Sequence, residues 1–474
     1  MGLLTMAPEI REMIFEAFVI DAIETCTRTK DRLKMTLKIT QICRTLRTAA
    51  FDYHRFWSTI HLHWHADAVQ FFLERARVQT NPDLHVFLDP QAGGTSNKRK
   101  KHQRWGKFLK EHMKIVRFLG IKITLNNGSP HIAAALGDTP APRLTRFELD
   151  LDERQTHNAN ITRLFDNNAP SLISMRIHAR APFEDLPNFA SLEELEYRVT
   201  EENFAGLLEM LERSPRLRYI SLKGASRWTP SPLPEVNPAL HTPVVLPDCS
   251  SLFIRGMDAQ RTWHILGHIS FPVMTRLDVY ERIFEHDNDL MGTIFGTLPK
   301  LPQNLELPPK DWLFVGIRPN LICIELEGYR YQCNWTNFHF QNLTDGAGAH
   351  LLFSFVIDAV TAAATVLHLQ PPKLHIENNI TFEEDNPLSL DLHDLNVLLT
   401  RIFAAYPLVE ELGLSGNTAY ITQQLRHTHA QSLPLLTTLK LERNLRLNIP
   451  ETYDADSVTA LQRTRNLEIV NSFL

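Results

Sequence analysis

Three histidines alternate along one short stretch, and their spacing is typical of a metal site. On a β-strand His61, His63 and His65 would share one face, because successive side chains point to opposite sides. Imidazoles gathered in this way can ligate a transition metal. The residues between them are apolar, so the polar positions of a half-buried strand near Ile60–Trp64 explain the pattern equally well. We therefore expect no metal site.

Acidic residues gather where Asp150 and Asp152 flank Leu151, two residues after Glu148. Two carboxylates could act as general acid and base only if a partner carboxylate faced them across a cleft. Acidic residues at the end of a strand explain the cluster better. The chain contains no GxSxG, HExxH, P-loop or GxGxxG motif. We expect no catalytic residue, no cofactor and no enzymatic activity.

One basic run stands out and consists of Lys98, Arg99, Lys100 and Lys101, followed by Arg104 and Lys107. Such a run could be a nuclear import signal or contact phosphates, or it could simply be solvated. Gly, Ser and charge occur together over residues 90–104, which predicts an exposed loop. The whole chain has 49 Lys and Arg against 54 Asp and Glu, a net charge of −5. This excludes a generally basic nucleic-acid protein, although not a local patch.

The cysteines are few and scattered, at Cys26, Cys43, Cys249, Cys323 and Cys333. No pair has CxxC spacing, so neither a zinc site nor a disulfide framework is indicated. Charged residues interrupt the N-terminal apolar stretch, and no run of 18 apolar residues occurs. These observations favour reduced thiols and a location in the cytoplasm, the nucleus or both, without a membrane span.

Two amphipathic helices open the chain and precede the first strand. Apolar residues follow helical spacing at Ile10, Met13 and Ile14, and again from Met35 to Tyr53. The aromatic pair Phe56-Trp57 then leads into the strand. Two short helices bury too little surface to fold alone, so they need the rest of the chain, a partner protein, or both.

Three segments in this region resemble a known family. They are Met6-Ala7-Pro8-Glu9-Ile10 with Ile14-Phe15 behind it, the stretch from Ile42 to Ala50, and Phe56-Trp57-Ser58-Thr59-Ile60. The first resembles the opening Leu-Pro-x-Glu-Ile, followed by Ile-Phe, of the F-box-like domains common in mushroom-forming fungi. The other two resemble the Val-Cys-Arg-x-Trp-Arg-x-Ala and Leu-Trp-Ser-x-Ile segments of the same domains. Met6 and Ala7 replace Leu-Pro, and Leu46 replaces the usual Trp.

The resemblance implies that these helices bind the Skp-type adaptor of a cullin-RING ubiquitin ligase. The residues that match the adaptor-binding segments are Met6, Pro8, Ile10, Ile14, Ile42, Cys43 and Leu46. Some of them must instead pack the helices together. Trp57 could touch a partner, but we expect it to fill the joint between the helices and the first repeat, a structural role.

Beyond residue 110 a pattern of three apolar residues recurs. They occupy positions i, i+3 and i+5. It occurs at Leu144/Phe147/Leu149, Leu172/Met175/Ile177, Leu192/Leu195/Tyr197, Leu217/Ile220/Leu222, Cys249/Leu252/Ile254, Met274/Leu277/Val279, Leu321/Ile324/Leu326, Val409/Leu412/Leu414 and Leu436/Leu439/Leu441. The last two continue to Asn417 and Asn444 and so match a leucine-rich repeat. A proline often precedes the strand and would end the helix before it.

This pattern predicts an α/β chain with an F-box-like helical domain over residues 1–60 and an irregular leucine-rich-repeat solenoid, or horseshoe, over 61–474. Asn417 and Asn444 should then be buried and hydrogen-bonded to the backbone, as structural residues. The repeats are poorly marked at 225–245, 281–310 and 328–390, where insertions or further units must lie.

The expected function is that of a substrate receptor in an SCF-type ubiquitin ligase, with the helices on the adaptor and the repeats on an unknown protein substrate. One alternative is a leucine-rich-repeat scaffold with no ligase partner. The other is a nuclear protein that contacts nucleic acid through the basic residues 98–107.

Overall fold

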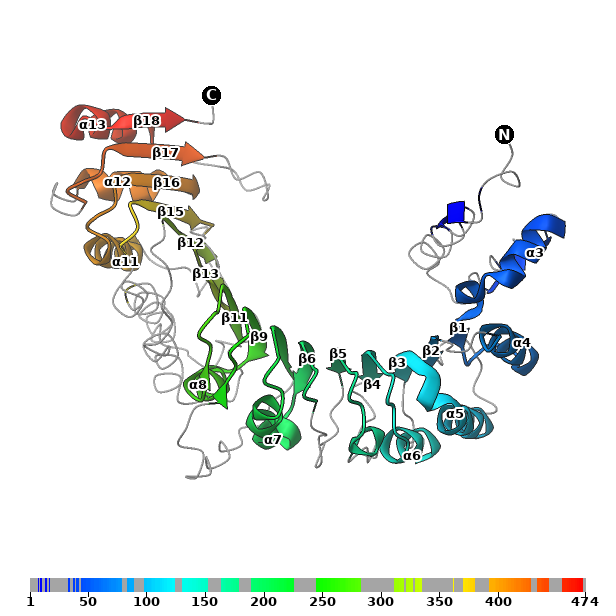
Figure 1. Cartoon of the computed structure of the whole chain (residues 1–474). Coiled ribbons are helices and arrows are strands. Elements are labelled where there is room, and N and C mark those ends of the chain that lie inside the picture. The colour runs from blue at the N-terminus through cyan, green and yellow to red at the C-terminus, as the bar shows by residue number, and fades with distance from the viewer. Residues whose placement is uncertain are drawn as a thin grey trace. The chain divides into compact units, whose positions relative to one another are not determined.

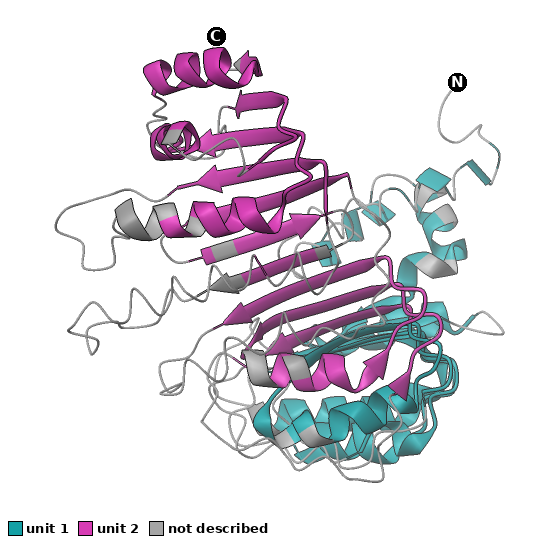
Figure 2. Ribbon diagram, turned by 90° about the vertical axis from the view of Figure 1, so that its left-hand side faces the viewer, with its two compact units in different colours: residues 1–217 teal, residues 218–474 magenta. Residues whose placement is uncertain are grey.

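The computed structural model of the chain describes twelve isolated positions before residue 44, the single position Thr361, and a series of continuous segments. The segments are 44–78, 83–88, 98–123, 130–151, 163–178, 189–225, 244–282, 311–318, 321–326, 329–334, 370–379, 392–427, 433–442 and 454–471. The chain divides into two compact units, residues 1–217 and 218–474 (Figure 2). Each combines helices with mostly parallel strands, which confirms the predicted α/β class. The predicted boundary at residue 60 lies within the first unit and stays a prediction.

Unit 1 carries a parallel sheet with the strand order β1-β2-β3-β4-β5-β6. The strands are β1 (Thr59–His61), β2 (Leu84–Leu88), β3 (Val116–Ile123), β4 (Arg146–Leu151), β5 (Ser174–His178) and β6 (Glu194–Val199). The helices are α3 (Arg44–Asp52), α4 (Ala66–Ala76), α5 (Lys98–His112), α6 (Pro130–Asp138) and α7 (Glu201–Glu212), with 3-10 turns at His54–Trp57, Met113–Ile115 and Phe165–Asn167. Helices α4 to α7 lie on one side of these strands (Figure 1).

The core of unit 1 lies between the strands and these helices. One register row runs straight across the sheet and is buried throughout, through Ile60, Val86, Leu119, Phe147, Met175 and Leu195. The helices contribute buried aromatic and aliphatic side chains, such as Phe72 and Trp105. Burying one such side chain contributes on the order of 3 kcal/mol, which explains the strict alternation of apolar positions in the strands.

Unit 2 is also mostly parallel, with the strand order β7-β9-β11-β14-β13-β12-β15-β16-β17-β18. The strands are β7 (Tyr219–Gly224), β9 (Ser251–Met257), β11 (Arg276–Arg282), β12 (Trp312–Arg318), β13 (Leu321–Leu326), β14 (Tyr329–Asn334), β15 (Lys373–Asn378), β16 (Glu411–Gly416), β17 (Thr438–Glu442) and β18 (Glu468–Asn471). The helices are α8 (Ala259–Gly267), α11 (Leu392–Ala405), α12 (Ala419–His427) and α13 (Ala455–Arg465), and β8 (Val244–Val245) pairs separately with β10 (Ile269–Ser270).

A tight turn recurs before the strands of both units. In each turn a backbone N–H donates to the carbonyl three residues earlier, as in Leu144 to Ala141, Leu172 to Ala169, Leu192 to Phe189, Leu217 to Ser214, Cys249 to Leu246, Val409 to Tyr406 and Leu436 to Leu433. The donor residue is the first apolar residue of the sequence pattern and is buried in these turns, whereas Met274, which donates to Phe271 in the same turn before β11, is half-buried. Pro142, Pro170, Pro215 and Pro407 occupy the second position of such turns, where their fixed φ fits. The prolines therefore shape the turn itself.

The predicted loop over residues 90–104 is wrong from Lys98 onward, because α5 begins there. Trp105, Leu109 and Met113 recur every four residues and are all buried, so they form one apolar stripe. The basic residues around this stripe form the outer surface of a helix. Residues 90–97 lie outside the described residues.

The predicted repeat at Leu321/Ile324/Leu326 is also wrong. It lies on β13, which is antiparallel to both β12 and β14, so these three strands form a meander. The sequence pattern does not predict strand β15, because the buried Pro371 stands where the other copies of the pattern carry Leu, Cys, Met or Val.

Candidate protein-interaction surfaces

The first surface is apolar and belongs to the N-terminal helical residues. Ile10, Met13 and Ile14 are helical, and their side chains are 45%, 66% and 38% exposed. Leu37, also helical, is 37% exposed. Residues three and four apart share one helix face, so Ile10, Met13 and Ile14 form an exposed apolar stripe.

The other residues predicted to bind the adaptor are less fully placed. Leu46 lies within α3, and its side chain is not described. Met6, Pro8, Ile42 and Cys43 lie outside the described residues.

Trp57 is completely buried at the end of the 3-10 turn that follows α3. Its indole Nε1–H donates to the Ala50 carbonyl at 2.7 Å, and its ring contacts Phe51 and Phe71 at 5.6 and 5.4 Å between centroids. Phe72 of α4 lies edge-on to the same indole at 5.0 Å. These contacts attach α3 to α4, as a side chain filling the joint would.

The three alternating histidines do not share one face, because β1 ends at His61. His61 is buried and stacks on Phe87 at 4.9 Å between ring centroids. His65 instead caps α4, where its Nδ1 accepts a hydrogen bond from the Asp67 backbone N–H at 3.4 Å. Within the described segments, no group of three His, Cys, Asp or Glu residues is placed to hold a metal ion.

The basic run begins α5, and its side chains have different environments. Lys100 is exposed, and Lys107 pairs with Glu111 at 3.7 Å. The Arg104 guanidinium donates to the Leu62 and Trp64 carbonyls, at 3.1 and 3.4 Å. The Lys101 ammonium lies 5.1 Å from the centre of the Trp105 ring. Part of the predicted import signal therefore belongs to the packing of α5.

Of the two repeat asparagines, Asn444 lies outside the described residues and Asn417 is half-buried after β16. The Asn417 backbone is paired on both groups. Its N–H donates to the Asn378 carbonyl at 2.7 Å, and its carbonyl accepts from the Asn378 side-chain amide at 2.9 Å. Asn378, which is fully buried, thus supplies a side-chain bridge of the kind expected from the repeat asparagine.

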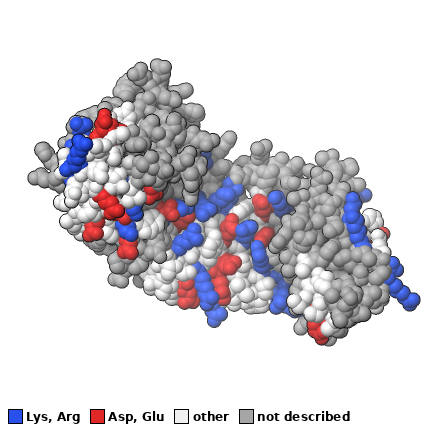
Figure 3. Space-filling model, turned by 90° about the horizontal axis from the view of Figure 1, so that it is seen from above, with Lys and Arg blue, Asp and Glu red and all other residues white. Residues whose placement is uncertain are grey.

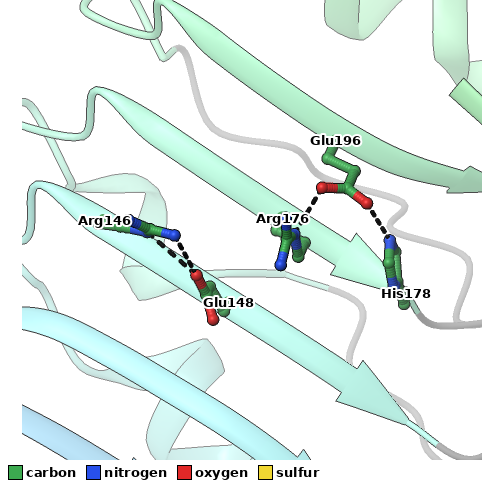
Figure 4. Close-up of polar contacts among 5 residues, drawn as sticks. All are labelled: Arg146, Glu148, Arg176, His178 and Glu196. Carbon is green, nitrogen blue, oxygen red and sulfur yellow. Dashed lines mark hydrogen bonds and ion pairs between the residues drawn. The ribbon is translucent and has the colours of Figure 1, made fainter. Parts of the chain in front are cut away.

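The exposed face of strands β4, β5 and β6 carries paired charges (Figure 4). Arg146 donates from Nε and Nη2 to one oxygen of Glu148, at 3.0 and 2.6 Å. On the next two strands the Glu196 carboxylate lies between Arg176 Nε, at 2.5 Å, and His178 Nε2, at 2.9 Å. Each exposed pair contributes about 0–1 kcal/mol, so the network orients side chains more than it stabilises the fold.

Basic and acidic side chains are interspersed on this face, since Lys122, Asp150, Glu194 and Arg198 occupy neighbouring outward positions. Figure 3, a view from above, likewise shows both signs mixed among the described residues. A surface of this kind matches a protein partner with charges of both signs better than a phosphate backbone.

A groove of about 600 Å³ lies on the face of unit 2 over strands β12 to β17, and we call it the meander groove. Its aromatic residues are Trp312, Phe314 and His375, and the Phe314 and His375 rings stack with 18° between their planes. A Cβ at Gly413 would lie 2.5 Å from His375 Nδ1, and one at Gly316 would lie 3.0 Å from the Phe314 ring. Both glycines therefore leave room for these rings.

The charged residues of the meander groove are largely paired. Arg330 binds Glu325 at 2.7 and 3.0 Å, and Arg318 binds Glu377 at 3.0 Å. Glu442, which is 49% exposed, lies 3.7 Å from His375 Nδ1. Burial lowers the pKa of His375 against the opposing effects of Glu442 and Glu377, so the imidazole is neutral at neutral pH.

Ser415, His375 and Glu442 follow the order of a hydrolase relay, with Ser415 Oγ 2.9 Å from His375 Nε2. The contact between His375 Nδ1 and Glu442 is too long for a hydrogen bond. Strand β16 is paired on both sides, so its amides serve the sheet and do not form an oxyanion hole. Burial also raises the pKa of the Cys323 thiol, which keeps it protonated. The groove is better suited to binding than to covalent chemistry.

No sequence motif indicates this groove, because its residues come from strands that only the reversed order β14-β13-β12-β15 brings together. The one available indication was the poor repeat pattern at 281–310 and 328–390 on either side of the meander. No protein-family model matches the chain, and no curated protein matches it. Among the described helices, none has both the length and the apolar composition needed to cross a membrane.

Proposed function

We propose that this chain is a substrate receptor of an SCF-type ubiquitin ligase, as its resemblance to F-box-like proteins implies. Its N-terminal helices dock on a Skp-type adaptor bound to a cullin scaffold, and its sheet faces hold a protein substrate. The chain then acts by raising the effective concentration of a substrate lysine near the ubiquitin-conjugating enzyme.

The observation that carries this proposal is the exposed apolar stripe of Ile10, Met13 and Ile14. Apolar side chains exposed side by side on one helix are typical of a partner-binding surface, because water contact with such a stripe is unfavourable. The stripe coincides with two of the residues that match the F-box opening segment, Ile10 and Ile14.

The recurring turn and strand support the finer fold proposal, an irregular leucine-rich-repeat solenoid with an N-terminal F-box-like domain. The same turn precedes strands in both units, and each is followed by a strand with one buried side. Repeats of this kind bury their apolar faces on neighbouring repeats. The packing of Trp57 against α4 would hold the adaptor-binding helices in a fixed orientation to the first strands.

The mixed charges of the exposed sheet faces favour a protein substrate over nucleic acid. Phosphate binding relies on a continuous basic surface. On β4 and β5 the outward Arg146 and Arg176 are paired with carboxylates instead.

The test is direct binding of the full chain to a purified Skp-type adaptor, measured by co-precipitation and calorimetry. The double variant Ile10→Asp/Ile14→Asp should weaken binding at least tenfold, because each carboxylate would lose water in the contact. Both positions are exposed in the free chain, so the variant should unfold like the wild type.

A matched control is Val78→Asp, which makes the same kind of change at a 68% exposed valine elsewhere in unit 1. It should bind the adaptor normally. Full binding by the double variant, or no binding by the wild-type chain, would contradict the proposal and favour a scaffold without a ligase partner.

A further inference from the structure

The meander groove lies where the strand order of unit 2 reverses. Parallel pairing of β11 with β14 and of β12 with β15 encloses the antiparallel strand β13. Gly316 and Cys323 are small residues in the lining of the groove, and Gly413 leaves room for the adjacent His375 ring. These small positions leave room for the groove between the longer side chains of Arg318, Arg330 and Glu377.

The dimensions of the groove suit an extended polypeptide. Its lining runs from Gln332 on β14, across β13, β12, β15 and β16, to Glu442 on β17. Strands in a sheet lie about 4.8 Å apart, so these five steps span about 24 Å. An extended chain of about seven residues covers the same length.

One aromatic platform lies within this path. The Phe314 and His375 rings stack at 5.4 Å between centroids, and Gly316 and Gly413 leave room for them. The flat face of such a platform accepts an apolar or a cationic side chain. Trp312, which is 38% exposed, adds an apolar wall on the same strand as Phe314.

The charge at the β17 end of the platform is negative and available. Glu325 and Glu377 already hold the arginines of the groove, and Lys440 binds Glu411 at 2.8 Å. Within the described residues, Glu442 contacts His375, whose imidazole is neutral, and also interacts electrostatically with Lys440. A carboxylate beside an aromatic platform is complementary to a guanidinium or ammonium group.

We infer that the meander groove binds an extended segment of a protein substrate that places an arginine or lysine on the Phe314–His375 platform against Glu442, and an apolar side chain against Trp312. This inference rests on the proposed function, since it names the substrate class of the receptor. Its geometry, however, concerns unit 2 alone.

The experiment is selection of phage-displayed random nonapeptides on the immobilised full chain, followed by binding measurements on the enriched peptides. Enriched sequences should share a basic residue and an apolar residue at a fixed spacing. Glu442→Lys should weaken their binding at least tenfold, and Trp312→Ala should weaken it several-fold.

The decisive arm repeats the selection on Glu442→Lys, which should enrich peptides with Asp or Glu in place of the basic residue. A misfolded groove could not exchange its preference in this way. Glu468→Lys, the same charge change on the neighbouring strand β18 and outside the groove, should retain the wild-type preference.

The inference is overturned if nothing is enriched, if the enriched peptides lack a basic residue, or if Glu442→Lys leaves their binding unchanged. Adaptor co-precipitation on the same preparations separates this result from failure of the proposed function. Peptide binding without adaptor binding would leave the groove assignment intact and remove the ligase.

Discussion

His264 and His268 lie one turn apart on and just after α8, and their rings are 4.5 Å apart between centroids. Burial lowers the pKa of His264 to about 4, with a smaller effect from His268. The unfolded chain takes up this proton near the ordinary histidine pKa, whereas the folded chain resists it to about pH 4. Folding is therefore fully stabilised above about pH 6.5 and loses stability as the pH falls toward 4.

We predict that His264→Gln reduces this loss, because glutamine does not titrate. Between pH 7 and pH 4 the free energy of unfolding of the wild type should fall by up to roughly 3 kcal/mol more than that of the variant. Urea denaturation at pH 7, 5.5 and 4 measures the difference. Parallel pH profiles for the two proteins would contradict the assignment.

Helix α5 contains two kinds of basic residue in one run, some that hydrogen-bond to neighbouring backbone and some that are only solvated. Their contributions to the stability of this helix can be compared. Arg104→Ala removes hydrogen bonds to the two carbonyls that follow β1 and should lower the free energy of unfolding by about 1 kcal/mol. Lys100→Ala, the matched control, should change it by less than about 0.5 kcal/mol, since Lys100 is exposed. Urea denaturation distinguishes them, and equal effects would mean that Arg104 does not attach α5 to β1. The role of Lys98 to Lys101 as an import signal stays a prediction.

Apolar spacing predicted the strands well because burial imposes it directly. The residues at Phe147, Met175 and Leu195 lie in one buried register row. Spacing carries no information on strand direction, which is why the pattern at Leu321 was assigned to a repeat although β13 is antiparallel. In α5 the charge run obscured the four-residue spacing of Trp105, Leu109 and Met113.

The two candidate surfaces also differ in whether local spacing in the sequence could predict them. The stripe of Ile10 and Ile14 could be predicted, because one helix holds both residues and local spacing decides their face. The meander groove could not, because Phe314, His375 and Glu442 lie on strands whose adjacency is set by long-range pairing.

At the scale of the whole molecule, the two proposed binding surfaces belong to different compact units. The apolar stripe lies in unit 1, and the meander groove lies in unit 2. Substitutions at separate sites that share no contacts usually act additively. A substrate receptor nevertheless needs both surfaces at once, because its output is transfer of ubiquitin to the bound substrate.

The full chain, the adaptor, the cullin and the remaining ligase components should therefore ubiquitinate a lysine-containing reporter fused to a peptide selected on the meander groove. Ile10→Asp/Ile14→Asp should still bind the reporter and yet lose its ubiquitination, because the adaptor no longer holds the chain. Glu442→Lys should still bind the adaptor and lose ubiquitination of this reporter, and a reporter with Glu in place of the basic residue should restore it. If Glu442→Lys abolished adaptor binding, or if the restored reporter bound without being ubiquitinated, the two surfaces would not act as parts of one receptor.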